Sequence, residues 1–274
     1  MGRNSKIEWT HHTFNPWWGC VKVSPACKYC YAESWAKRVG KQVWGSGSDR
    51  RFFTDQHWNE PRKWDKDAAI AGERKRVFCA SMADVFEARK DLNSWRDRLW
   101  SLIEETPNLD WLLLSKRPQR FATYLPWTNL PENIWLGTTV ENQTWAEKRI
   151  DQLLAIDASV RFLSCEPLLG KIDLGTWIDN GLDWIIAGGE SGPRARPTSP
   201  AWIRSLRDQC LVNDVPFHFK QWGHWAPEPL ESVRNIRHIA IKDDEGGPET
   251  VLCALGKSRA GRLLDGQEWD GVPG

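Results

Sequence analysis

The chain has 274 residues, with 37 Lys or Arg against 36 Asp or Glu, so its formal net charge is +1. This balance neither indicates nor excludes a nucleic-acid partner, and the length allows one large domain or two smaller ones, each with a hydrophobic core. No apolar run is long enough to span a membrane, and the N-terminus lacks the apolar segment of a signal peptide, so we expect a soluble, cytoplasmic protein.

The N-terminal part of the chain is predicted to contain a first strand within residues 9–18. A loop with three clustered cysteines follows, and a helix is predicted over residues 31–39. Residues 40–75 are charged and rich in tryptophan and do not follow the pattern of the rest of the chain. We interpret them as an insertion after the first helix that could serve as a lid.

Six short apolar segments then recur at regular intervals, and their nearly continuous apolar character is typical of strands buried on both faces. These predicted strands are residues 77–82, 110–115, 134–140, 160–165, 183–188 and 216–221. Helices are predicted between them over residues 92–105, 118–124, 145–156 and 199–210. The last helix has Ser199 as its N-cap and Pro200 in its first turn. Tryptophans on these elements are expected in the core: Trp111, Trp135, Trp184 and Trp202.

The alternation of strands and helices predicts βα repeats with a parallel sheet. Six or seven units, without a Gly-x-Gly-x-x-Gly turn after an early strand, favour a barrel over a doubly wound sheet. The predicted fold class is therefore α/β, a parallel (β/α) partial barrel over residues 1–222 with the insertion at 40–75. Residues 223–274 are predicted to be a C-terminal extension with one hairpin, formed by residues 236–241 and 249–254 around a turn at 244–248.

Polar residues or glycines end every predicted strand, and in a (β/α) barrel the site forms at these C-terminal strand ends. Strand ends are often polar because they meet solvent, so the stronger signal is that three apolar strands run directly into Glu141, Glu166 and Glu190. Carboxylates can bind an amine or ribose hydroxyls, and lysines can hold a carboxylate or a phosphate. Candidate site residues are Ser81, Asp84, Ser115, Lys116, Arg117, Thr138, Thr139, Glu141, Ser164, Glu166, Gly188, Gly189, Glu190, Lys220 and Gln221.

The three clustered cysteines, Cys20, Cys27 and Cys30, are the clearest sign of chemistry. Three thiolates can hold a metal centre with one position open, whereas a structural metal site is closed by four ligands. Four further cysteines stand singly in apolar surroundings and are expected to be buried thiols, since seven cysteines in this arrangement do not form a secreted disulfide framework. They are Cys79, Cys165, Cys210 and Cys253.

Zinc is the alternative metal for this loop. A zinc knuckle normally has a second pair of ligands about 12 to 20 residues further on. The next candidates here are His57 and Cys79, both further away, although His11 or His12 upstream could supply a fourth ligand. A structural zinc and a [4Fe–4S] cluster held by three cysteines both remain open at this point.

The segment from residue 13 to residue 33 resembles the cluster motif of radical S-adenosylmethionine (SAM) enzymes. Cys27-Lys28-Tyr29-Cys30 matches the end of their Cys-x3-Cys-x2-Cys signature, including the aromatic residue, but the first gap has six residues in place of three. The segment is more similar still to the phage-type three-cysteine-motif proteins of phages and bacteria. This likeness extends over nearly the whole chain, including residues 81–86, 164–167, 188–191 and 261–266.

The resemblance implies a radical-SAM-like partial barrel and an enzyme, but it supplies no substrate. Cys20, Cys27 and Cys30 would ligate a [4Fe–4S] cluster, and SAM would chelate its fourth iron. One electron, from a donor of the flavodoxin or ferredoxin type, would cleave SAM to methionine and a 5′-deoxyadenosyl radical that abstracts hydrogen from the substrate. Cys79 could return a hydrogen atom, although a buried packing role is the simpler interpretation.

The resemblance also implies roles for individual residues. Tyr29 would lie near the adenine of SAM, and Ser81 and Asp84, at the end of the second strand, would contact its amino group. Gly188-Gly189-Glu190 would suit adenine or ribose contacts. The remaining cofactor-binding candidates are Ser115, Lys116, Thr139, Glu141 and Glu166, and the substrate candidates are Arg117, Lys220 and Gln221.

Two classes of function therefore compete. One is a radical SAM enzyme whose substrate is unknown, with a nucleic acid or nucleotide as a candidate. The other is a zinc- or iron–sulfur-stabilised nucleic-acid-binding protein without catalysis, because basic residues alternate with aromatic ones over residues 50–76. A solvated lid with its own small core explains the same pattern. The residues in question are Arg50, Arg51, Arg62, Lys63, Arg74, Lys75, Arg76, Phe52, Phe53, Trp58 and Trp64.

Overall fold

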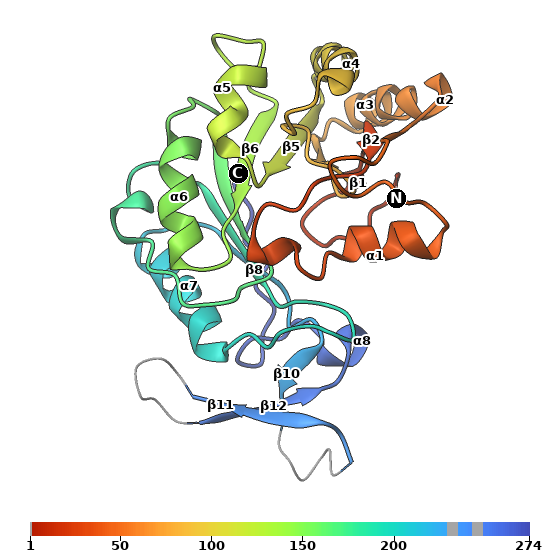
Figure 1. The fold of residues 1–274 in the computed structure, drawn as a ribbon. Helices are drawn as coiled ribbons and strands as arrows, with labels where there is room; N and C mark the ends of the chain where they lie inside the picture. Colours follow the sequence, from red (N-terminus) through yellow and green to blue (C-terminus); the bar gives the residue numbers. More distant parts are fainter. Residues whose placement is uncertain (1, 229–234, 243–248) are drawn as a thin grey trace. The chain divides into compact units, whose positions relative to one another are not determined.

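A computed structural model describes residues 2–228, 235–242 and 249–274 (Figure 1). Seven strands form a sheet in the order β1-β4-β5-β6-β7-β8-β9, and the pairings given for its strands are all parallel. This confirms the predicted α/β class with the parallel strands of a partial (β/α) barrel. The strands are β1 (His12–Thr13), β4 (Lys75–Cys79), β5 (Leu109–Ser115), β6 (Ile134–Thr139), β7 (Val160–Cys165), β8 (Trp184–Gly188) and β9 (Phe217–Gln221).

The chain divides into two compact units that are interleaved along the sequence. The first unit comprises residues 1–24, 32–138 and 152–161, and the second comprises residues 25–31, 139–151 and 162–274. The cysteine loop crosses between them, because Cys20 belongs to the first unit whereas Cys27 and Cys30 belong to the second. Each unit is therefore described by itself.

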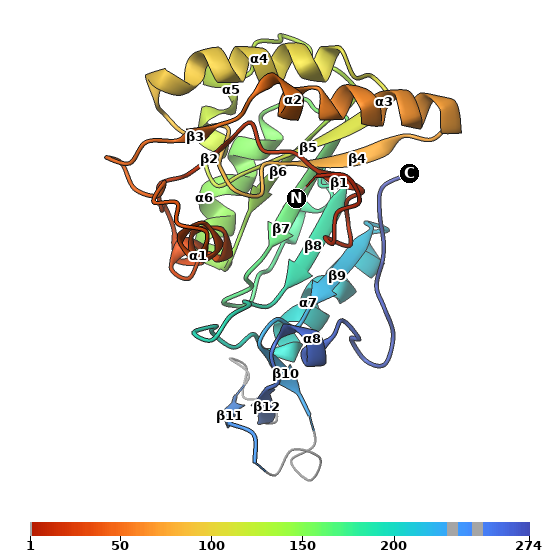
Figure 2. The ribbon, with the colours of Figure 1, turned by 90° about the vertical axis from the view of Figure 1, so that its right-hand side faces the viewer.

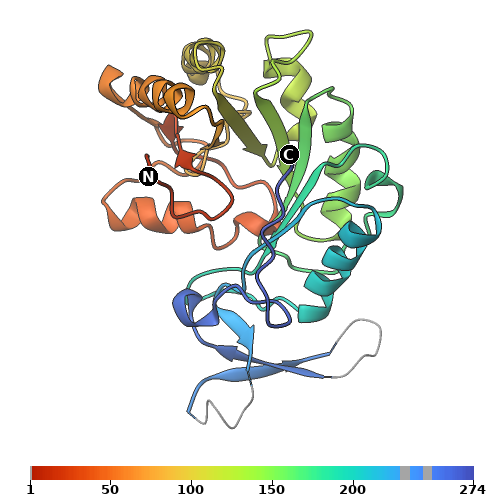
Figure 3. The same cartoon turned by 180° about the vertical axis from the view of Figure 1, so that it is seen from behind.

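In the first unit, β1 and β5 pair with the two edges of β4, so that Val77 lies in register with both His12 and Trp111. Helix α3 (Glu60–Ala71) packs against β4 and β5, and helix α4 (Asn93–Glu104) lies beside it (Figures 2 and 3). Trp64 and Ala68, one turn apart on α3, are both buried, as expected for the core-facing side of a helix. Helix α3 ends at Gly72, whose φ of 66° is the left-handed conformation that glycine adopts most easily.

Residues 40–75 contain more regular structure than the sequence indicated. Strand β3 (Arg51–Phe52) pairs antiparallel with β2 (Trp17–Trp18). Helix α2 (Asp55–Trp58) and helix α3 then lead directly into β4. Helix α3 was not predicted, although its buried positions have helical spacing, because the charged and tryptophan-rich composition of this segment indicates an insertion.

The remaining helices lie close to their predicted ranges. They are α1 (Tyr31–Arg38), α4, α5 (Phe121–Tyr124), α6 (Gln143–Leu154) and α7 (Pro200–Val212). Ser199 caps α7 as predicted, since its hydroxyl oxygen accepts a hydrogen bond from the backbone N–H of Ala201. Short 3-10 turns lie at Pro25–Cys27, Lys90–Leu92, Pro118–Arg120 and Gly175–Trp177.

In the second unit, the C-terminal part of the chain forms a small sheet with the order β10-β12-β11. Strands β11 (His238–Ile241) and β12 (Thr250–Ala254) are antiparallel, which confirms the two strands of the predicted hairpin, while its turn at 244–248 lies outside the described residues. Strand β10 (Trp225–Pro227) pairs with the other edge of β12, and helix α8 (Lys257–Ala260) follows.

The final segment of the chain runs beside β9 (Figure 2). The backbone N–H of Phe219 donates to the carbonyl of Trp269 at 2.9 Å, and that of Gly271 donates to the carbonyl of Phe217 at 3.0 Å. The indole of Trp184 on β8 donates to the carbonyl of Gly271 at 2.7 Å. These bonds satisfy backbone groups that an edge strand would otherwise leave to solvent.

The core is built largely on the predicted strands and tryptophans. Trp111 and Trp184 are fully buried and Trp135 is nearly so, as expected, whereas Trp202 on α7 is only half-buried. Among the described helices, none combines the length and the apolar character needed to cross a membrane.

Candidate functional site

The ends of β4 and β5 in the first unit meet at the buried carboxylate of Asp84. This carboxylate accepts hydrogen bonds from the Ser115 hydroxyl at 2.8 Å, the Lys116 backbone N–H at 3.1 Å and the Phe86 backbone N–H at 3.0 Å. The Arg117 guanidinium pairs with it at 2.7 Å. Burial alone would raise the pKa of Asp84, but Arg117 and these hydrogen bonds outweigh it and lower the pKa.

Arg117 connects this strand end to the cysteine loop. Its Nη1, which pairs with Asp84, also lies 3.7 Å from the Sγ of Cys20, and its Nη2 donates to the carbonyl of Val21 at 2.8 Å. Burial and the Asp84 carboxylate raise the pKa of Cys20 to about 12, while Arg117 acts in the opposite direction. The sequence placed Arg117 with the substrate and Asp84 with SAM, and the structure brings both to Cys20.

Ser81 lies in the same loop as Asp84 and contacts Asn15. The Asn15 amide donates to the Ser81 hydroxyl at 3.1 Å and accepts from the backbone N–H of Met82 at 2.7 Å. The backbone N–H of Gly19 donates to the Met82 carbonyl at 2.9 Å. Asn15 was not predicted as a site residue, although an Asn-Pro pair directly before two tryptophans is a turn signal.

In the second unit, Glu141 holds the other part of the cysteine loop. Its fully buried carboxylate accepts from the backbone N–H of Ala26 at 3.1 Å, one residue before Cys27. Arg149 on α6 pairs with the same carboxylate at 2.9 Å and donates to the carbonyl of Thr139 at 2.8 Å. Arg149 was not predicted, because its role depends on how α6 packs against the end of β6.

Tyr29, between two of the cysteines, lies against cationic side chains of the second unit. The guanidinium carbons of Arg194 and Arg196 are 5.0 and 5.4 Å from the centre of its ring. Arg196 in turn binds Glu190 through its backbone N–H at 2.8 Å and its side chain at 2.9 and 2.5 Å. Glu190 and Tyr29, both selected from the sequence, are thus connected through an arginine that was not.

The ends of β7, β8 and β9 bring together a second group of predicted residues. Lys220 pairs with Glu166 at 3.1 Å, and the Ser164 hydroxyl lies 3.4 Å from the same carboxylate. The Gln221 amide donates to the Ser191 hydroxyl at 3.1 Å.

The two glycines at the end of β8 lie close to other protein groups. A Cβ atom at Gly188 would lie 2.9 Å from Oε1 of Glu166, and one at Gly189 would lie 1.9 Å from the carbonyl oxygen of Trp222. The resemblance implies adenine or ribose contacts for these glycines. In the structure, the absence of a Cβ atom allows close approach of Glu166 and of the backbone after β9.

The cysteine thiols are the candidate metal ligands of the site. All seven cysteines are described, and none forms a disulfide. Cys20, Cys27 and Cys30 are half-buried, whereas the other four are buried as predicted. In the described part of the chain, no three His, Cys, Asp or Glu side chains are grouped so as to hold a metal ion.

The histidines named as alternative zinc ligands make local contacts. Nδ1 of His11 accepts from the Arg76 backbone N–H at 2.9 Å, and Nδ1 of His12 accepts from that of Asn4 at 3.3 Å. Nε2 of His57 is hydrogen-bonded to the carbonyl of Asn15 at 2.9 Å. These contacts give each ring a structural role in the first unit.

The basic residues of the segment 50–76 are mostly paired with carboxylates. Arg50 is buried and binds Glu87 at 2.6 Å, and Trp58 and Trp64 are buried as well. Arg51 lies over the ring of Trp18 at 4.2 Å. The pattern read as a possible nucleic-acid surface is therefore largely accounted for by packing and by the pairs Arg62–Glu105, Lys63–Glu60, Arg74–Asp110 and Lys75–Glu73.

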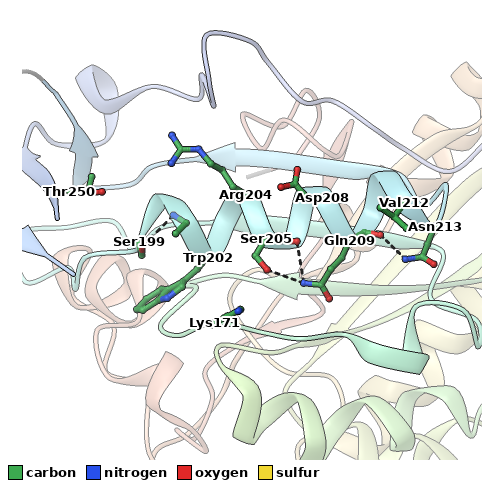
Figure 4. A pocket seen from close by; sticks show the side chains of 11 residues that line it. Lys171, Ser199, Trp202, Arg204, Ser205, Asp208, Gln209, Val212, Asn213 and Thr250 are labelled. Atoms are coloured by element: carbon green, nitrogen blue, oxygen red, sulfur yellow. Dashed lines mark hydrogen bonds between the residues drawn. The ribbon is translucent and has the colours of Figure 1, made fainter. Parts of the chain in front are cut away.

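A surface pocket of ≈ 660 Å³ lies along α7 in the second unit (Figure 4). Its polar groups largely satisfy one another, since the Gln209 amide donates to the carbonyl and hydroxyl of Ser205 and the Asn213 amide donates to the carbonyl of Gln209. None of the site residues selected from the sequence lines it.

The fold is a parallel α/β arrangement whose strand ends carry charged side chains. Two of these side chains, Arg117 in the first unit and Glu141 in the second, bind the backbone of the cysteine loop. The chain belongs to the protein family of unknown function DUF5131, whose model matches residues 4–273. A comparison with curated proteins finds no match.

Two solved structures of spore photoproduct lyase variants are similar to this chain. One, with bound AdoMet and a dinucleoside spore photoproduct, has a TM-score of 0.48 and 11% identity, and the match covers 93% of this chain and 71% of that one. The other has a TM-score of 0.48 and 13% identity, and the match covers 92% of this chain and 71% of that one.

Proposed function

We propose that this chain is a radical SAM enzyme that holds a [4Fe–4S] cluster on Cys20, Cys27 and Cys30 and binds SAM at the cluster. The observation that carries the proposal is the anchoring of the cysteine loop by buried charged side chains. In the first unit, Arg117 contacts both Cys20 and Val21. In the second unit, Glu141 binds the backbone of Ala26. Burying an ion pair carries a desolvation penalty. A loop that served only as a turn would not require two such pairs, so their presence supports a functional role for this loop.

The chemistry of the donors suits the cluster, although the three thiols are not grouped around one point in the structure. Three cysteines in one short loop, none in a disulfide and none fully buried, supply three thiolates and leave one iron for another ligand. When bound, such a cluster supplies one electron for cleavage of SAM to methionine and a 5′-deoxyadenosyl radical.

The contributions of individual side chains follow from their contacts. Asp84 is engaged by four donors and Glu141 by two, so we assign both to positioning the loop rather than to direct contact with SAM. The Glu166–Lys220 pair is only partly buried and offers a carboxylate and an ammonium group to a ligand. We assign it to SAM or substrate.

Anaerobic reconstitution with iron and sulfide tests the proposal. We expect a brown protein with about four irons per chain, and formation of 5′-deoxyadenosine when SAM and a reductant are added. Replacing any one of the three loop cysteines by alanine should abolish both properties. Cys253→Ala, which removes a buried thiol far from the loop in sequence, is the matched control and should retain them.

Two results would overturn the proposal. One is a colourless protein that binds a single zinc ion and releases no iron after reconstitution. The other is a Cys20→Ala variant that retains its full iron content and still cleaves SAM.

A further inference from the structure

Arg117, just after β5 in the first unit, presents its guanidinium to three acceptors. Nη1 donates to a carboxylate oxygen of Asp84 at 2.7 Å and forms a longer hydrogen bond, at 3.7 Å, with Sγ of Cys20. Nη2 donates to the carbonyl of Val21 at 2.8 Å. The side chain of Arg117 is only 7% exposed. Because the acceptors come from two segments of the chain, the plane and position of the guanidinium are both fixed.

The position of Arg117 does not depend on the thiol alone. The Asp84 carboxylate that pairs with it is itself held by the Ser115 hydroxyl at 2.8 Å and by the Lys116 backbone N–H at 3.1 Å. The Ser115 oxygen also accepts from the backbone N–H of Arg117 at 2.9 Å. The guanidinium is therefore held in place before any ligand binds. A charged donor in such a buried place forms strong hydrogen bonds, because little water competes with it.

The contacts around Cys20 suit a sulfur atom that has lost its proton. While the proton is present, the thiol donates to the carbonyl of Val21 at 3.4 Å. Cysteine binds a metal as the thiolate, which can only accept hydrogen bonds. The Val21 carbonyl would then keep Nη2 of Arg117 as its donor, and Nη1 would remain beside the sulfur. Both acceptors thus retain a donor when the thiol is deprotonated.

We infer that Arg117 raises the reduction potential of the cluster by donating a hydrogen bond to the sulfur of Cys20. The inference rests on the proposed function, in which Cys20 ligates that cluster. The step concerned is a one-electron reduction in which an external donor is oxidised and no bond forms or breaks. The added electron makes the ligating sulfurs more negative, so a hydrogen bond to one of them stabilises the reduced form more than the oxidised form. Arg117 acts through Cys20 and is a positioning residue.

A redox titration of the reconstituted full-length chain, followed by electron paramagnetic resonance, tests the inference. The first variant is Arg117→Lys, which keeps a positive charge beside Asp84 but cannot reproduce the two-armed contact with Cys20 and Val21. We expect the equilibrium constant for reduction to fall about tenfold, which corresponds to a potential lower by about 59 mV for a one-electron couple. The iron content should remain at about four per chain.

A double variant separates the hydrogen bond from the local charge. Arg117→Met combined with Asp84→Asn removes one positive and one negative charge, so the net charge near Cys20 is unchanged while the donor to its sulfur is lost. A potential lowered as in Arg117→Lys would assign the effect to the hydrogen bond. A potential equal to that of the unchanged protein would overturn the inference.

Arg74→Lys is the matched control. Arg74 pairs with Asp110 at 2.7 Å and donates to the carbonyl of Pro107 at 2.9 Å, so it also joins an aspartate to a backbone carbonyl. It lies in the same unit but beside the starts of β4 and β5, whereas Arg117 follows the end of β5. The potential of the Arg74→Lys variant should equal that of the unchanged protein within the error of measurement.

The remaining outcomes distinguish this inference from the proposed function. Equal potentials in the unchanged protein and both Arg117 variants, each with its full iron content, would refute the inference and leave the proposed function intact. An equal fall in Arg74→Lys would refute it by indicating a general loosening of the unit. Loss of the cluster from Arg117→Lys alone would show that Arg117 is needed to bind iron and does not tune its potential. An unchanged protein that forms no cluster would refute the proposed function and the inference with it.

Discussion

For Arg117, the sequence predicts that the residue belongs to the site, but the role of its side chain follows only from the structure. The sequence identified Arg117, Asp84 and Ser115 as polar strand ends, and the structure brings all three together. Their mutual pairing was not predicted, because it depends on β4 and β5 being neighbours in register. The same holds for Glu141, which was selected for its position after an apolar strand but is bound to Arg149 and Ala26.

The Arg117–Asp84 pair makes a prediction about stability. Arg117→Met leaves the buried Asp84 carboxylate without its cation, so we expect the free energy of unfolding to fall by about 3–5 kcal/mol. Urea denaturation followed by circular dichroism measures this change.

A double variant separates the charge effect from loss of packing. Arg117→Met combined with Asp84→Asn removes both charges and should recover part of the lost stability. If Arg117→Met unfolds at the same urea concentration as the unchanged protein, the pair does not anchor the loop.

At the scale of elements, the regular apolar segments were sufficient to predict six of the seven parallel strands, and β7 was found with both of its ends. The segments that were missed lie where local pattern is weak. Strands β2 and β3 are two residues each and exist only because Trp17 pairs with Phe52 and Trp18 with Arg51. The first strand, predicted within residues 9–18, is confirmed as β1, which is equally short and is held on β4 by contacts that include two histidines.

These histidines predict a dependence of stability on pH. Nδ1 of His12 accepts from Asn4, and burial, followed by the nearby charges of His11 and Arg3, lowers the pKa of His12 to about 4. The unfolded chain binds a proton below its ordinary pKa of about 6.5, while the native chain remains neutral. Stability contributed by this residue is therefore present above about pH 6.5 and is lost progressively as the pH falls toward 4.

His12→Asn tests this dependence. The asparagine keeps an acceptor for the Asn4 N–H and does not titrate, so its urea midpoint should fall less between pH 7.5 and pH 5 than that of the unchanged protein. Burial also lowers the pKa of His11, so some pH dependence should persist in the variant. An identical fall in both proteins would show that His12 is protonated in the native state.

At the scale of the whole molecule, the sequence predicted the α/β class from the rhythm of its elements, but it could not reveal how the end of the chain is used. The sequence predicts residues 223–274 to be an extension to a barrel that ends at residue 222. Residues 162–274 form part of one compact unit, and the segment around Trp269 bonds to β9. The sequence around Trp269 has no strand pattern that would predict this pairing with β9, because these residues form no strand of regular length.

The tail predicts how far the chain can be shortened. A chain that ends after Trp222 would lose the backbone bonds to Phe217 and Phe219, the partner of the Trp184 indole and the ion pairs of Asp265 with α7. An exposed apolar edge strand pairs readily with other chains, so we expect this truncated protein to aggregate or to be degraded. A chain that ends after Gly271 keeps all of these contacts and should match the unchanged protein in soluble yield and urea midpoint. If the chain that ends after Trp222 is as soluble and as stable as the one that ends after Gly271, the tail is a dispensable extension and β9 is stable as an uncovered edge.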